Sequence, residues 1–85
     1  MSVFHHKAIL VKKERTNCWF CFYPDIVSAD SLFGEFCLDI DDWSMMITQS
    51  IDHPQSDRSV AALVSKIRRE YQTSNEVPSE IYFIA

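Results

Sequence analysis

The chain has 85 residues, a formal net charge of −4 and 47% hydrophobic residues. This composition predicts one folded domain over residues 1–85 and excludes wholesale disorder. No apolar run approaches the roughly 20 residues that cross a bilayer. Residues 1–13 also lack the apolar core of a signal peptide. We therefore expect a cytoplasmic protein with no membrane partner.

Two strands are predicted in the first quarter of the chain. Residues 8–12 are apolar and partly β-branched, which favours a strand. Residues 16–23 are dense in aromatic residues and cysteine, which predicts a second strand buried on much of both faces. Pro24 ends this strand, because proline has no N–H to donate to a sheet.

The clearest strand pattern lies at residues 35–41. Apolar and polar residues alternate there, with Phe36, Leu38 and Ile40 between Glu35, Cys37, Asp39 and Asp41. A period of two predicts one face toward the core and one toward water. The acidic side chains should therefore project from the same face.

Residues 44–51 fit two patterns. Alternation of Met45, Ile47 and Ile51 indicates a strand, while Trp43, Met46, Ile47 and Ile51 tolerably fit a helix. The β-branched pair Ile47 and Thr48 favours a strand, and no good helix cap precedes it. We predict a strand.

An amphipathic helix is predicted over residues 58–72. Its apolar stripe has helical spacing and consists of Val60, Leu63, Val64, Ile67 and Tyr71. Residues 80–85 then predict a last, largely buried strand. The expected fold class is α+β: two layers, an antiparallel sheet of about five strands covered by one main helix, in the order β-β-β-β-α-β.

No cofactor or metal signature stands out. Cys18 and Cys21 match C-x-x-C, but residues three apart on a strand point to opposite faces, and zinc needs further ligands. We interpret Cys18, Cys21 and Cys37 as free thiols that act as small core residues. Asp39, Asp41 and Asp42 lack the glycine and distal glutamate of a calcium loop. We expect neither a metal site nor a cofactor, and no catalytic residues.

The charge distribution points to a protein partner. Every Lys and Arg lies before Thr16 or after Asp57, and eight acidic residues occupy positions 25–57. Nucleic acid is not expected as a partner, because phosphates are bound by Lys and Arg. A basic protein surface suits this block better. The candidate binding residues are Glu35, Asp39, Asp41, Asp42, Asp25, Asp30 and the bordering Trp43. The alternative is an ordinary solvated face, partly matched by basic residues on the next strand.

The segments FGEFCLDIDDW, SMMITQSID, SVAALVSKIRREYQ and VPSEIYFIA together resemble small immunity proteins of bacterial contact-dependent inhibition and related polymorphic toxin systems. The resemblance covers roughly the last sixty residues and consists of element order, size and acidity. It implies a cytoplasmic, non-enzymatic antitoxin that binds a cognate toxin domain, often a basic nuclease, and covers its active site with acidic side chains.

Two other classes of function remain open from the sequence. One is an adaptor or structural subunit that dimerises through an exposed edge strand. The other is a small thiol- or metal-dependent enzyme, which would need a base beside Cys21 or Cys37, or a metal. The oligomeric state and the toxin's activity are not specified by the sequence.

Overall fold

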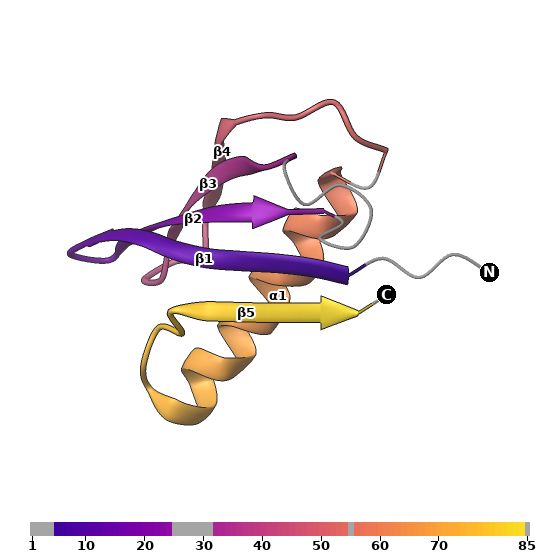
Figure 1. The fold of residues 1–85 in the computed structure, drawn as a ribbon. Coiled ribbons are helices and arrows are strands. Elements are labelled where there is room, and N and C mark those ends of the chain that lie inside the picture. The colour runs from indigo at the N-terminus through magenta and orange to yellow at the C-terminus, as the bar shows by residue number, and fades with distance from the viewer. Residues whose placement is uncertain (1–4, 25–31, 55, 85) are drawn as a thin grey trace.

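A computed structural model describes residues 5–24, 32–54 and 56–84. It contains five strands and one helix in these residues (Figure 1). The elements are β1 (His5–Glu14), β2 (Asn17–Tyr23), β3 (Gly34–Asp39), β4 (Met45–Gln49), α1 (Ser56–Ser74) and β5 (Glu80–Ile84). The predicted order and the two-layer α+β class are confirmed. Among the described residues, no helix is both long and apolar enough to cross a membrane.

The five strands form one antiparallel sheet in the order β4-β3-β2-β1-β5. Strands β1 to β4 follow one another as neighbours, and β5 returns to pair with β1, as in the register Ala8↔Ile81. The sheet therefore has β4 at one edge and β5 at the other. Figure 1 shows α1 crossing one face of the sheet.

The core lies between the sheet and α1. The predicted helix stripe is confirmed, because Val60, Leu63 and Ile67 are buried, and Val64 packs against the core in a half-buried position. Sheet residues complete the core: Ala8, Cys18, Phe20, Phe22, Phe36, Leu38 and Ile81 are buried there. The ring centroids of Phe20 and Phe36 lie 5.5 Å apart. Burial of this apolar core, aromatic and aliphatic side chains together, is the main favourable contribution to folding.

Helix α1 ends at a residue with left-handed backbone. Asn75 has a φ of 59°, and its N–H donates to the Tyr71 carbonyl oxygen at 2.7 Å. Asparagine tolerates this conformation at a helix C-terminus better than most residues do. The chain can then turn back, and β5 begins at Glu80.

The first strand is longer than predicted. Its start at His5 brings His6 into the core face, where it is buried and stacks on Phe83 at 6.1 Å between ring centroids. The strand predicted over residues 8–12 did not include this buried histidine. The strand prediction for residues 44–51 is confirmed, because β4 covers Met45–Gln49.

A close approach at Gly34 fixes the start of β3. A Cβ atom there would lie 2.6 Å from the backbone oxygen of Gln49 and 2.7 Å from the ring of Phe22. Only glycine fits between these atoms without displacing β4 or the core. The single glycine of the chain thus sets how closely β4 packs on β3.

Candidate functional site

The face of the sheet opposite α1 is called the open face below. Along β3, Glu35, Cys37 and Asp39 alternate with the buried Phe36 and Leu38, so these three side chains lie on the open face and are half-buried. Glu35 Oε1 accepts a hydrogen bond from Thr48 Oγ1 of β4 at 2.7 Å. The prediction that Glu35 and Asp39 share a face is confirmed.

The strands beside β3 do not neutralise these carboxylates. Neither β2 (NCWFCFY) nor β4 (MMITQ) contains a lysine or arginine. Among the described residues, the ion pairs are Lys7–Glu80 at 3.7 Å and Lys12–Glu14 at 3.5 Å, both away from β3. The alternative of a charge-matched neighbouring strand therefore does not hold for the strands on either side of β3.

The β3–β4 turn adds two exposed carboxylates. Asp39 Oδ1 accepts the N–H of Asp41 at 2.9 Å, and Asp42 Oδ1 accepts the N–H of Ser44 at 2.9 Å. The hydrogen bond from the Ser44 backbone lowers the pKa of Asp42 below its ordinary value. Asp39 and Asp42 therefore shape the turn, while the side chain of Asp41 is exposed.

One prediction about the acidic face needs correction. Strand β3 ends at Asp39, so Asp41 belongs to the turn and is not aligned with Glu35 by strand alternation. The N–H of Trp43 donates to the Asp39 carbonyl oxygen at 2.7 Å, which closes the turn two residues earlier than the alternation indicated. Asp25 and Asp30, which we also predicted as binding residues, lie outside the described residues.

Trp43 packs on the helix side of the sheet. Its ring meets Tyr71 edge-on at 5.7 Å between centroids, and the Arg68 guanidinium lies 5.5 Å from its ring centre. Its φ of 63° is unusual for a bulky residue and costs roughly 1–3 kcal/mol. Packing against the core offsets this cost. Trp43 therefore borders the acidic turn but does not share the face of Glu35 and Asp39.

Sequence reasoning missed the exposed apolar surface of β4. Met45, Met46 and Ile47 are 41%, 65% and 37% exposed, so three consecutive apolar side chains meet solvent. A shallow hollow beside them is lined by Asn17, Cys37, Asp39, Ser44, Met45 and Met46. The available signal was the absence of any charged residue between Trp43 and Ile51. The hollow joins this apolar strand to the carboxylate of Asp39.

The cysteines occupy two environments. Cys18 is buried in the core as predicted, but Cys21 and Cys37 are half-buried on the open face, so they are not core residues. Burial raises the pKa of all three thiols, which favours the unreactive protonated form at neutral pH. Within the part of the chain that the structure describes, no three His, Cys, Asp or Glu side chains gather as metal ligands.

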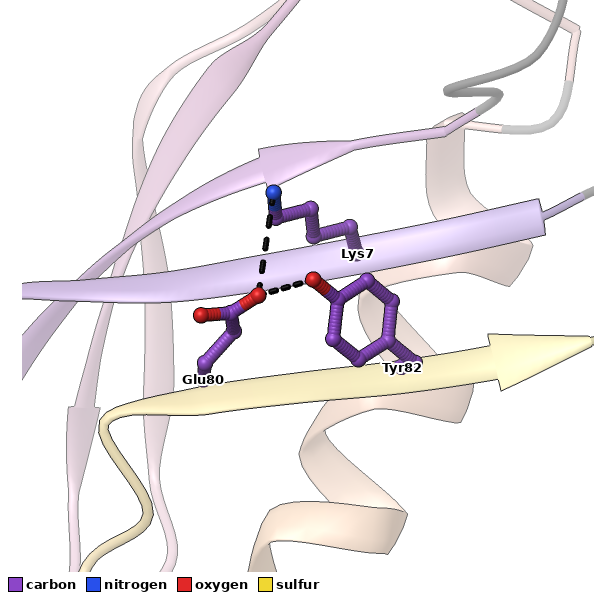
Figure 2. A network of polar contacts seen from close by, with 3 residues as sticks. All are labelled: Lys7, Glu80 and Tyr82. Atoms are coloured by element: carbon purple, nitrogen blue, oxygen red, sulfur yellow. Dashed lines mark hydrogen bonds and ion pairs between the residues drawn. The ribbon is translucent and has the colours of Figure 1, made fainter.

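On the open face at the β1–β5 edge, charged and polar side chains contact one another. Figure 2 shows Glu80 of β5 between Lys7 of β1 and the hydroxyl of Tyr82, which donates to the Glu80 carboxylate. The Lys7 ammonium also lies 5.4 Å from the centre of the Tyr82 ring. These groups satisfy one another, so the described carboxylates of the open face that have no ion pair, Glu35 and Asp39, lie on β3.

Comparison with known proteins gives no assignment: no protein-family model, curated protein or solved structure matches the chain.

Proposed function

We propose that the chain is an immunity protein that binds and neutralises a basic toxin domain through the acidic half of its sheet. The observation that carries this proposal is the group Glu35, Asp39, Asp41 and Asp42 on β3 and its turn, with no lysine or arginine on the flanking strands. Such a surface attracts Lys and Arg of a partner and speeds association. Met46 beside it supplies apolar area that a partner can desolvate.

The proposal places the protein in the cytoplasm, where a toxin nuclease would act. By covering the basic cleft of such a toxin, the carboxylates would take the place of substrate phosphates. The raised thiol pKa values weigh against a thiol-dependent enzyme, because the thiolate is the nucleophile in that chemistry. Binding is therefore the function that this surface supports best.

A second candidate function is a dimerising adaptor subunit. The uncharged, exposed edge strand β4 favours it, because such edges pair with other strands. Sedimentation of the pure protein over a range of concentrations separates the two functions. A monomer supports the immunity function, and a stable dimer supports the adaptor.

The proposal predicts a toxin domain encoded beside this chain's gene, and titrating that domain against charge variants tests the immunity function. The double variant Glu35→Lys, Asp41→Lys should weaken binding by about tenfold or more and lower protection of cells, because it places cations against a basic surface. Asp41→Lys alone should mainly slow association, since an exposed rim charge acts on encounter. These variants leave the turn-forming side chains of Asp39 and Asp42 in place.

Glu70→Lys is the matched control for Asp41→Lys, because it makes the same change of charge at an exposed position of α1. It should bind the toxin domain as the wild type does. Raising the salt concentration should weaken the wild-type complex more than that of the double variant. If the folded double variant binds and protects like the wild type, the acidic surface is not the interface.

A further inference from the structure

Among the described residues, no strand pairs with the outer side of β4, which forms one edge of the sheet. The N–H of Asp39 donates to the Ser44 carbonyl oxygen at 2.9 Å, which shows that Ser44 faces β3. Backbone groups alternate sides along a strand, so Met46 also faces β3, while Met45 and Ile47 direct their N–H and C=O groups outward. A strand beside this edge could form hydrogen bonds with two N–H donors and two C=O acceptors of β4.

Two features that usually prevent strand pairing, charged side chains and proline, are missing from this edge strand. Residues Met45–Gln49 include no charged residue and no proline. The register shift opposite Glu35 and Phe36 leaves one extra residue in β4, Thr48, which bounds the regular stretch at Ile47. The regular part of β4, which has no charged residue, therefore consists of the exposed apolar residues Met45, Met46 and Ile47.

The charges around β4 favour some partner strands over others. Asp41 and Asp42 precede β4, Glu35 lies beside Thr48, and Asp52 follows the strand. A second copy pairing antiparallel about Met46 would bring Asp41 and Asp42 of one copy near Asp52 of the other. Like charges at both ends oppose that arrangement. A partner strand with positive ends meets opposite charges instead.

We propose that β4 accepts an extended segment of a partner protein as a sixth strand, with three apolar residues flanked by Lys or Arg. The central apolar side chain would lie beside Met46 on the open face, and its two neighbours would lie beside Met45 and Ile47 on the other face. The basic ends would reach Asp42 and Glu35. As far as the partner is a toxin domain, this inference rests on the proposed function.

The test uses the blocked peptide Lys-Val-Ile-Val-Lys and ¹⁵N-labelled protein. Addition of the peptide should shift the amide resonances of Met45 and Ile47 and slow their hydrogen exchange, because both N–H groups gain acceptors. The same peptide with glutamate at both ends should bind about tenfold more weakly or worse. Shifts confined to β5 or to α1 would overturn the proposal.

Backbone methylation separates strand addition from side-chain contact. N-methylation of the first valine removes an N–H that points to β4 and should weaken binding about tenfold or more. N-methylation of the central isoleucine removes an N–H that points away from β4 and should leave binding nearly unchanged. Equal binding by both methylated peptides would contradict strand pairing.

A variant of β4 tests the same hydrogen bonds from the protein's side. Met45→Pro removes one outward N–H at the first residue of an edge strand, a position where proline is tolerated. It should lose binding of the basic peptide, while Met45→Val, which keeps the N–H, should bind. Circular dichroism checks that both variants fold. Resonance shifts of β4 that grow with protein concentration, without peptide, would assign the edge to a second copy and overturn the proposal.

The toxin titration keeps the two proposals apart. If Met45→Pro binds the toxin domain normally while Glu35→Lys, Asp41→Lys does not, the immunity function stands and strand addition falls. If the peptide pairs with β4 but the toxin domain does not bind the wild type, strand addition stands and the immunity function falls.

Discussion

The two edges of the sheet are protected differently. At β5, the Lys66 ammonium of α1 donates to the carbonyl oxygen of Tyr82, and the Lys7–Glu80 pair lies against the same strand (Figure 2). At β4, neither the strand nor its neighbour β3 contributes a basic side chain. The difference shows that an edge strand is protected here by side chains from other elements.

The position of α1 explains this asymmetry. The helix makes its main sheet contacts with β5, β1 and β2, and Figure 1 shows its later turns running beside β5. A groove between α1 and β5 is lined by Ala62, Ser65, Lys66, Arg69, Tyr82 and Phe83. That edge is therefore basic, while the β4 edge is apolar with acidic ends. Partners of opposite charge are expected at the two edges.

The largest expected effect comes from truncating apolar side chains in the core beneath α1 and in the edge strand β4. Leu63→Ala removes a fully buried side chain of α1 and should cost about 2–5 kcal/mol of unfolding free energy by leaving a cavity. Ile47→Ala in β4 should cost less than about 1 kcal/mol, because its side chain is already partly exposed. Urea denaturation measures both values. Equal losses would show that β4 is as well packed as the helix side.

A smaller effect is expected from removing the Lys66 ammonium that contacts the β5 edge. Lys66→Met keeps an unbranched apolar side chain but removes the donor to the Tyr82 carbonyl oxygen. The stability loss should be below about 1 kcal/mol, since the bond is exposed to water. The control Arg69→Met removes a charge from the same groove and keeps the backbone carbonyl oxygen that accepts the Thr73 hydroxyl. Urea denaturation gives the unfolding free energy of both variants. A larger loss in Lys66→Met than in Arg69→Met would show that the hydrogen bond, and not the charge alone, stabilises the protein.

The smallest expected effect is a pH response of the β3–β4 turn. Asp42 holds the N–H of Ser44 as a carboxylate, and its pKa in the folded protein is lowered below 3.8. A lowered pKa means that the stabilisation is present above the unfolded pKa and is lost as the pH falls through the folded pKa. The Ser44 amide resonance should move in acid with a midpoint below that value.

Asp42→Asn provides the control for this titration. Its amide oxygen can still accept the Ser44 N–H, but it does not ionise. The acid transition at Ser44 should therefore disappear in the variant. A transition that persists unchanged would have to come from another carboxylate and would contradict the role of Asp42 in the turn.

Several parts of the fold followed from local patterns. The spacing of Val60, Leu63 and Ile67 predicted the helix, and the alternation around Phe36 and Leu38 predicted β3 and its buried face. These patterns are reliable because side-chain direction repeats with the period of the element itself. They failed at Asp41, where hydrogen bonds of the turn, and not alternation, set the backbone.

The site was only partly predictable. Charge counting found Glu35, Asp39, Asp41 and Asp42, since the absence of lysine and arginine is visible in the chain itself. It did not find Met45 and Met46, because whether an apolar residue is buried depends on which elements cover it. A strand of the same composition would be buried if it lay between two others.

The sequence by itself determined the element order, the helix stripe and the acidic middle of the chain, because each depends on residues close to one another in the sequence. Only the tertiary structure decided that β5 pairs with β1, that β4 lies at an edge, and that α1 shields one edge and not the other. These features depend on long-range packing. The Lys66 contact with Tyr82 joins residues sixteen positions apart, and no local pattern specifies it.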